Sequence, residues 1–350
     1  MDELVLNKTP LRTANNYQIN DIKLKNICIP EELKEFQNVE ISGNSEAVKF
    51  EENKKNIKYG VGDLLVRQAN ESSNKNIKIE LKSNEDVDIC FNFDKNNKEL
   101  VDSVYVKAKK GANSNLIIKY KSEEDLEYFH NGIIKLEAEE DSTINVIVVN
   151  LLNTNSNNFM TIDNLLAENS NVNYTIIDFG GKNSISNYYS NMQGDSSKSN
   201  LNAIYLGKEN QLFDINYIAE IFGKKADVNI EVQGALKDNS KKHFKGTIDF
   251  KNGAKKAKGN ENEFCILLSE NAKSISLPML LCTEDDVEGT HSTASGKVDQ
   301  KELFYIMSRG FSYKEAIKLI VRAKFNQIIT SINNKDLEDE ILLEIDRRLD

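Results

Sequence analysis

Tryptophan is absent from this chain of 350 residues, and proline occurs at three positions only, Pro10, Pro30 and Pro278. Proline removes one hydrogen bond from a sheet ladder, so it is confined mainly to edge strands and bulges. Two of the three prolines lie in the first 30 residues. The middle of the chain is therefore compatible with long, uninterrupted strands.

Cysteine is also scarce. The four cysteines, Cys28, Cys90, Cys265 and Cys282, are far apart in the sequence and form no CxxC pair. In a reducing compartment such residues are expected to be small, buried hydrophobic side chains rather than zinc ligands or disulfides.

Three further absences limit the class of protein. The formal net charge of −10 and the pI near 5.1 argue against a nucleic-acid binder, whose surface would be basic. No run approaches the roughly 18 consecutive apolar residues of a membrane-spanning helix. The N-terminus lacks the basic and apolar regions of a signal peptide. We therefore expect a cytoplasmic protein that binds neither membranes nor nucleic acid.

A repeat is present in the middle of the chain. Several segments, such as "EDSTINVIVVN" (140–150) and "ENSNVNYTIID" (168–178), combine a small polar turn with a strand-like apolar run. The first apolar residues of six such strands are Val87, Leu116, Ile144, Val172, Leu201 and Val228. Their intervals of 29, 28, 28, 29 and 27 residues indicate a β-solenoid with at least two strands per period of about 28 residues. A β-sandwich with coincidental spacing is the alternative.

The repeat predicts a mainly β fold with three parts. Residues 1–76 form a small N-terminal α/β segment, residues 77–297 the solenoid core, and residues 298–350 a C-terminal helical domain. Within the core we expect the six apolar residues of the repeat to form one inward column.

The C-terminal region changes to a helical period. Ser312 and Glu315 form a capping box at the start of one helix, and Asp336 is the expected N-cap of the last one. The helices are expected to cover the end of the solenoid, where unpaired ladder groups would otherwise be exposed. One apolar face of the first helix is expected to contain Leu303, Phe304, Ile306 and Met307.

The usual catalytic motifs are missing. The sequence contains no Walker A motif, no GxGxxG after a strand, no GxSxG and no HExxH. Its three histidines, His130, His243 and His291, are far apart. Most acidic residues fall at predicted turns, whereas solenoid enzymes that act on polysaccharides carry clustered carboxylates on one sheet face. We therefore do not expect an enzyme.

The stretch "DVEGTHSTASGKVDQKELFYIMSRGF" (286–311) closely resembles the signature of the SufB/SufD family of iron–sulfur cluster assembly proteins. The opening "TPLRTANNYQINDIKL" also resembles the SufD type, with Tyr17 where many members carry Trp. This resemblance implies a right-handed parallel β-helix followed by a C-terminal helical domain. The matching residues of the C-terminal signature are Pro278, Asp286, Val287, His291, Gly296, Leu303, Phe304, Tyr305, Ser308, Arg309, Gly310, Glu315 and Ala316.

The departures from the signature favour SufD over SufB. The family's cysteine falls on Gly289, and Thr293 and Ala294 stand where Ala-Thr is usual. A chain that holds a cluster by itself would offer several thiolates in one place, whereas this signature offers His291 alone. The resemblance implies that His291 faces a partner chain and is a candidate iron ligand. An interface histidine without a metal stays open.

The resemblance also implies the partners. A SufB chain would pair with this solenoid, and the SufC ATPase would bind helices 299–309 and 313–329, with Phe304, Met307 and Arg309 as candidate contacts. Any iron–sulfur cluster would be transient and shared with a partner, with none on the isolated chain. A homodimer in isolation stays open. The alternatives are a self-sufficient SufB-like homodimeric scaffold and a polysaccharide enzyme.

Overall fold

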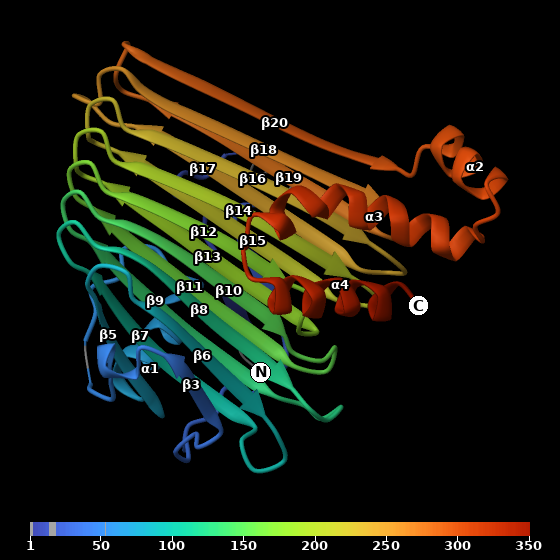
Figure 1. Ribbon diagram of the computed structural model, residues 1–350, viewed down its shortest axis with the longest axis horizontal. Coiled ribbons are helices and arrows are strands. Elements are labelled where there is room, and N and C mark those ends of the chain that lie inside the picture. Colours follow the sequence, from blue (N-terminus) through green and yellow to red (C-terminus); the bar gives the residue numbers. More distant parts are fainter. Residues whose placement is uncertain (1–2, 14–18, 53) are drawn as a thin grey trace.

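The computed structural model describes residues 3–13, 19–52 and 54–350, and Tyr17 of the N-terminal motif lies outside them. The core is a solenoid of about eight turns in which successive strands alternate between two sheets (Figure 1). Sheet 1 contains β3 (Val39–Gly43), β6 (Asp86–Phe93), β8 (Asn113–Ser122), β10 (Thr143–Leu151), β12 (Asn171–Asp178), β14 (Lys198–Gly207), β16 (Asp227–Leu236), β18 (Ala257–Leu267) and β20 (Val287–Lys297). Sheet 2 contains β4 (Val48–Lys49), β5 (Lys75–Leu81), β7 (Glu99–Ala108), β9 (Phe129–Ala138), β11 (Asn157–Leu166), β13 (Asn183–Met192), β15 (Leu212–Ile221), β17 (Lys241–Phe250) and β19 (Lys273–Cys282).

The strands from β5 to β20 pair in parallel, each with the strand two places away in the sequence. This arrangement confirms the predicted solenoid with two strands per period. Alternate residues of each strand point inward, so the apolar side chains of both sheets meet in one continuous core between them.

The predicted single column of apolar residues is wrong in its register. Leu116 lies opposite Val146 rather than Ile144, and Leu201 lies opposite Tyr174. The bends between rungs differ in length, so the first apolar residue of a strand moves by two positions. Such a shift keeps the side chain on the same face, because the side-chain period of a strand is two. The six residues therefore occupy two adjacent columns of sheet 1, and all are buried in the core: Val87, Leu116, Ile144, Val172, Leu201 and Val228.

A ladder of asparagines stabilises the outer face of sheet 1. The side-chain amide of Asn145 donates to Asn115 at 2.8 Å, that of Asn173 to Asn145 at 2.9 Å, and that of Asn200 to Asn173 at 2.8 Å. Each amide donates to one neighbour and accepts from the next, so the stacked rungs are held in register on the solvent side as well as in the core.

The N-terminal segment covers the outer face of sheet 2. The hairpin of β1 (Leu4–Leu6) and β2 (Ile22–Leu24) and the helix α1 (Asp63–Glu71) form a second hydrophobic cluster with this face. Farther along the sheet, the side chain of Asn7 donates to Asp214 Oδ1 at 2.8 Å, and Lys245 Nζ donates to the Asn7 carbonyl at 3.0 Å. The segment therefore crosses several rungs.

The prediction that the C-terminal helices cover the end of the solenoid is wrong. These helices are α2 (Gln300–Ser308), α3 (Tyr313–Thr330) and α4 (Lys335–Leu349). Helices α3 and α4 pack on the outer face of sheet 1 (Figure 1). The reason is a row of apolar residues on that face, which would otherwise be exposed to water. The row and the helices form one cluster, whose sheet members include Ile147, Val149, Ile177, Ile204 and Ala235.

The helix boundaries follow local sequence signals. The Ser312 side chain accepts from the Glu315 amide while the Glu315 carboxylate accepts from the Ser312 amide, so the predicted capping box is confirmed. The last helix begins two residues earlier than predicted, because the side chain of Asn334, and not that of Asp336, accepts from the Leu337 amide.

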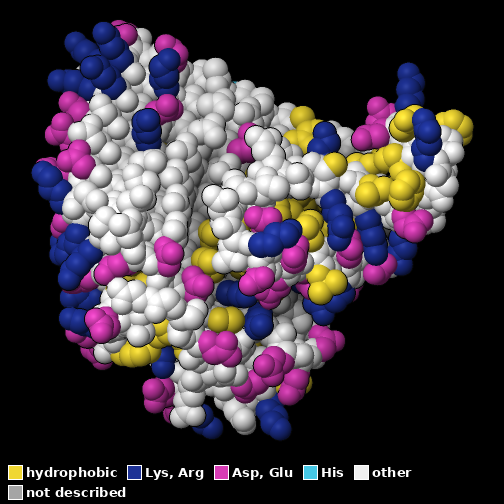
Figure 2. Space-filling model, in the orientation of Figure 1, with side chains coloured by type: hydrophobic (Ala, Val, Ile, Leu, Met, Phe, Trp, Pro, Cys, Tyr) yellow, Lys and Arg dark blue, Asp and Glu magenta, His cyan; other side chains and the backbone are white. Residues whose placement is uncertain are grey.

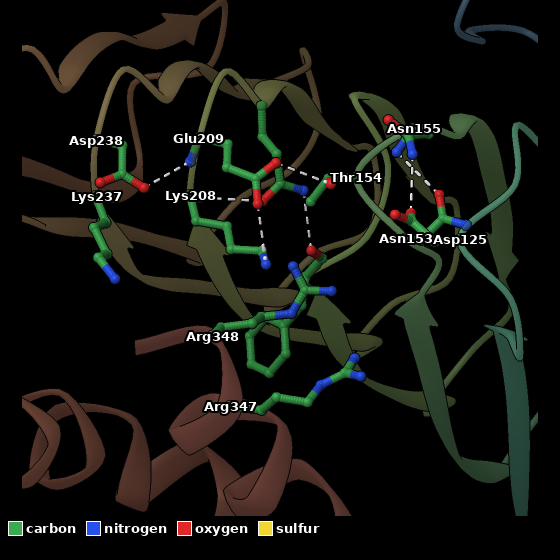
Figure 3. Close-up of polar contacts among 12 residues, drawn as sticks. Asp125, Asn153, Thr154, Asn155, Lys208, Glu209, Lys237, Asp238, Arg347 and Arg348 are labelled. Atoms are coloured by element: carbon green, nitrogen blue, oxygen red, sulfur yellow. Dashed lines mark hydrogen bonds and ion pairs between the residues drawn. The ribbon is translucent and has the colours of Figure 1, made fainter. Parts of the chain in front are cut away.

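The end of α4 is anchored to the turns between rungs (Figure 3). The buried Arg348 donates to the Leu152 carbonyl at 3.5 Å, and its guanidinium lies over the Phe179 ring. Lys237 Nζ donates to the Leu349 carbonyl at 3.4 Å. The neighbouring turns hold each other in the same way as the asparagine ladder: the Glu209 amide donates to Asp238 Oδ2 at 2.9 Å. The helical domain and the solenoid therefore form one packed body.

A charge in the core should unfold the rungs around it. We expect Ile144→Asp to lower the free energy of unfolding by on the order of 4 kcal/mol or more, because a buried carboxylate would have no partner. Thr143→Asp, one residue away on the outer face and outside the asparagine ladder, should cost about 1 kcal/mol or less. Urea unfolding followed by circular dichroism measures both. Equal effects would contradict the inward position of Ile144.

Candidate functional site

The solenoid ends in an uncovered rung. Among the strands of the described residues, β19 and β20 each pair with one neighbour only, so both have an unpaired edge (Figure 1). All residues from 288 to 295 of β20 are exposed. Unpaired edges of this kind are places where another chain can add strands.

His291 lies on the inward face of this last rung. Its ladder partner in β18 is Glu261, and the residues on either side of His291 point outward. These two neighbours are fixed to β18 by side-chain hydrogen bonds, from Thr290 to Asn260 at 2.6 Å and from Ser292 to Asn262 at 2.7 Å. His291 is therefore held above Glu261 in the inward column, and it is exposed because no further rung covers it.

A buried ion pair lies one rung below the opening. Lys242 Nζ lies 2.7 Å from Glu263 Oε1, and neither side chain is exposed. Tyr205 and Ser276 donate to the two oxygens of the same carboxylate, at 3.0 Å and 2.9 Å. This charge pair is fully bonded, which is the condition under which a buried ion pair is tolerated.

Glu261 has a different environment. Its side chain is fully buried, and neither carboxylate oxygen has a hydrogen-bond partner within the described residues. Burial, followed by the negative charge of Glu263, raises the pKa of Glu261 to about 8. Across the core Glu261 reaches Gly246, where a Cβ atom would lie 2.2 Å from Oε2. Glycine at this position makes the space for the carboxylate.

The other histidines lie elsewhere. His130 is buried in the middle of the solenoid, with its ring nitrogens 2.8 Å from Asp102 Oδ1 and 2.6 Å from Asn158 Oδ1. His243 lies 3.5 Å from Asp214. Within residues 3–13, 19–52 and 54–350, no three His, Cys, Asp or Glu side chains come close enough together to hold a metal ion.

The expectation for the cysteines is wrong for two of them. Cys265 is buried, and Cys90 is half-buried, but Cys28 and Cys282 are exposed. Cys282 is exposed because it ends β19 in the uncovered rung. It lies above Phe250, whereas the residue of β19 above Gly246 is Pro278, in the middle of the strand. Cys282 and Glu261 therefore face different parts of the opening.

An apolar surface covers the outer side of α2 and the start of α3 (Figure 2). The sequence predicted one face, but Leu303 and Ile306 pack toward the helical core, while Phe304 and Met307 point outward and are 74% and 40% exposed. We call this the α2 surface. Its members are Phe304, Tyr305, Met307, Phe311 and Tyr313. Arg309 extends it through a guanidinium that lies over the Tyr305 ring.

A groove of about 710 Å³ on sheet 2 contains three carboxylates among seven lysines. Each carboxylate is already bonded. Glu80 pairs with Lys78, Glu137 accepts from the Tyr105 hydroxyl, and Asp163 pairs with Lys135. Glycoside hydrolysis needs one carboxyl as acid and a second as base or nucleophile, and this arrangement gives no support to that chemistry.

Comparison with known families decides the assignment. The model of the family described as "SUF system FeS cluster assembly, SufBD core domain" matches residues 91–324, which include most of the solenoid and the signature around His291. This chain belongs to the SufBD family.

Curated SufBD relatives agree with this assignment. The chain is 28% identical over 165 residues to the iron–sulfur cluster assembly protein SufD of Bacillus subtilis, and 23% identical over 163 residues to SufD of Escherichia coli. Each match covers 47% of this chain and 38% of the relative. A SufBD family protein of Pyrococcus horikoshii is 30% identical over 152 residues, 43% of this chain and 32% of that protein. The chain thus matches less than half the length of these relatives. Together with the family model, these matches confirm the prediction of a SufD-like family member.

The sequence signals for this SufBD chain differ in what they reveal. The motif around His291 identifies the exposed rung, but nothing in the motif indicates Glu261, Glu263 or Lys242. Their inward position follows only from the register of β18 and β17 on the preceding rungs, where Glu261 stands above the buried Ile230. Among the helices of the described residues, none combines the length and hydropathy needed to cross a membrane.

Glu261 should make stability depend on pH. Its pKa in the folded chain, about 8, lies above the usual 4.5. The folded chain therefore keeps a proton that the unfolded chain releases, and stability falls as pH rises from about 4.5 to about 8. Glu261→Gln replaces the carboxyl group with an amide, which does not ionise in this range. We expect its gain in free energy of unfolding over wild type to grow from near zero at pH 5 to on the order of 3 kcal/mol at pH 8.

Urea unfolding at several pH values measures this difference. The matched control is Glu288→Gln, which removes an exposed carboxylate from the same end of the solenoid and should change stability equally at both pH values. A constant effect of Glu261→Gln across the range would mean that folding does not change the pKa of Glu261, and would contradict its position in the apolar interior.

Proposed function

We propose that this chain is a non-catalytic, SufD-type scaffold subunit of an iron–sulfur cluster assembly complex. The observation that carries the proposal is the uncovered last rung, which brings His291 of the family signature to a surface between two unpaired strand edges. Membership of the SufBD family supports the same reading. The chemistry of assembly would then occur between subunits rather than within this chain.

The two unpaired edges support pairing with a second solenoid, in the proposed complex SufB. Strands added to β19 and β20 would satisfy the free backbone groups of both sheets at once. Such a partner would cover the exposed segment 288–295 and would face His291 directly. A homodimer of this chain could use the same edges in the absence of SufB.

His291 would supply one ligand to a cluster or iron ion that the complex handles as its cargo. A neutral imidazole binds iron without adding charge to the site. The cysteine position of the family signature is Gly289 here, so the soft thiolate ligands of a cluster would come from the partner. A Cβ atom at Gly289 would lie 3.1 Å from the Phe250 ring, so the position faces the same opening.

The α2 surface supports a second contact, proposed here as the binding site of SufC. Exposed aromatic and methionine side chains grouped on one surface are typical of protein interfaces. The sequence has no P-loop, so ATP hydrolysis would have to come from such a partner. The contact residues proposed are Phe304 and Met307 of the α2 surface, together with Arg309, which extends it.

The second candidate is a self-sufficient, SufB-like scaffold that holds a cluster in a homodimer. Two copies of the chain joined at the last rung would bring together two His291 residues and no thiolate from the signature position. Exposed Cys282 at the end of β19 is the observation that keeps this candidate open. Reconstitution of iron and sulfide on the isolated chain separates the two functions.

A charge on the α2 surface should prevent SufC binding. We expect Phe304→Asp to abolish co-purification with the SufC ATPase while pairing with SufB is retained, because a carboxylate would be desolvated in an apolar contact. Leu343→Asp is the matched control: Leu343 is 70% exposed on α4, outside the α2 surface, and its change should leave both partners bound. Loss of SufB together with SufC would show that α2 is needed for the fold alone.

His291 should matter for cluster formation and not for assembly. We expect the isolated chain to hold little or no stable cluster, and His291→Ala to reduce cluster formation on the complex with SufB and SufC without disrupting the complex. Absorption spectra after anaerobic reconstitution measure the cluster, and gel filtration measures assembly. Normal maturation by the variant would make His291 a hydrogen-bonding interface residue. A stable cluster on the lone wild-type chain would favour the SufB-like candidate.

A further inference from the structure

We infer that Glu261 is a second metal ligand of this chain, which together with His291 forms half of a site for a divalent first-row metal ion at the open end of the solenoid. The inference rests on the proposed role of His291 and adds to it a residue outside the signature. It accounts for a feature that the fold does not require: a fully buried carboxylate with two unpaired oxygens.

The contrast with Glu263 shows that Glu261 is unusual even in this interior. Both glutamates belong to β18 and both point inward. Glu263 binds Lys242, Tyr205 and Ser276, so its charge is compensated on all sides. Glu261 has no such partners among the residues described, so its ionised form would cost several kcal/mol in the folded chain. A dication that takes the place of the carboxyl proton would remove that cost.

The ladder places His291 on the rung directly above Glu261. His291 and Glu261 are partners on adjacent rungs, and the bonds from Thr290 and Ser292 to β18 prevent β20 from sliding. Adjacent strands are about 4.8 Å apart. Nitrogen and oxygen donors each lie about 2.1 Å from a first-row metal ion, so two donors on opposite sides of it are about 4.2 Å apart. The rung spacing is therefore compatible with one ion between the two side chains.

The shape of the interior preserves this carboxylate. Gly246 on the opposite sheet leaves the space that the Glu261 carboxylate occupies, and any side chain there would collide with it. Pro278 lies above Gly246 in the same uncovered rung as His291. Glu261 is buried beneath His291, and His291 is exposed toward the missing next rung, which is the side from which an ion and the partner's ligands would arrive.

The donor set indicates the class of metal. One imidazole nitrogen and one carboxylate oxygen suit Fe²⁺, Mn²⁺, Co²⁺ or Zn²⁺ and are poor ligands for Cu⁺, which prefers sulfur. Two protein ligands leave several coordination positions open for sulfide, water or a partner's side chains. The half-site would therefore bind the ion weakly on its own and more tightly once the partner is present.

Cobalt binding to the full-length chain tests the inference. Co²⁺ is titrated anaerobically into wild type and variants, with calorimetry for affinity and the visible d–d absorption for coordination. We expect one weak site in the wild type, and affinity about tenfold or more lower in both His291→Ala and Glu261→Gln. Glu288→Gln, an exposed carboxylate on β20, is the control and should bind as the wild type does.

The outcomes separate this inference from the proposed function. Weakened binding in His291→Ala with unchanged binding in Glu261→Gln would overturn the role of Glu261 and leave that of His291 intact. Unchanged binding in His291→Ala would overturn both. Absence of any Co²⁺ site in the wild type would also overturn the half-site. Unfolding curves at pH 8 accompany the titration, because Glu261→Gln should be more stable than the wild type, so weaker binding cannot then be ascribed to loss of fold.

Discussion

Every inward side chain of this solenoid depends on the next rung to shield it from water. Parallel ladders give each strand two neighbours, and the side chains of successive rungs stack at the same spacing as the backbones. The dependence stops at β19 and β20, which have no rung above them. His291 is exposed for this reason alone, since its column is fully buried in the rungs below. The exposure of His291 is thus a direct consequence of where the stack of rungs ends.

The N-terminal and C-terminal segments each cover part of the outer face of one sheet. The N-terminal hairpin and α1 cover sheet 2, and α3 and α4 cover sheet 1, so each sheet has one face in the core and part of the other under a separate hydrophobic cluster. Within the described residues neither terminus adds a strand to the last rung, although the Thr13 hydroxyl contacts the Met279 sulfur of β19 at 3.7 Å. The interior itself accepts polar groups where they are fully bonded, as His130 is between Asp102 and Asn158. Glu261, close to the open end, is a departure from that rule.

The sequence predicts the period of the solenoid because each rung repeats the same small polar turn and apolar run. It does not predict the columns, because the bends vary in length and move residues such as Ile144 by two positions. The capping box at Ser312 is predictable because its signal is local. The place of the helices is not, because the outward row that they cover is hidden in runs such as "NVIVVN", where both faces of the strand are apolar.

The candidate site divides in the same way. His291 is evident from its motif, whereas Glu261 lies in "GNENE". The inward and outward positions of this segment are both polar, so no alternation of apolar and polar residues shows which face is buried. Only its register above Ile230 reveals that it belongs to the core. Local sequence therefore identifies residues exposed on the last rung, while residues beneath them become visible only when the rungs are aligned in three dimensions.

The double edge of the last rung has a consequence for molecular recognition. A chain that adds a strand to one sheet can slip along it, and a slip of one residue turns all its side chains to the opposite face. A chain that extends both β19 and β20 must satisfy two ladders through one short connection, so a slip on one side would require the same slip on the other. A partner that pairs with both strands would therefore be restricted to one alignment before any side chain contributes specificity.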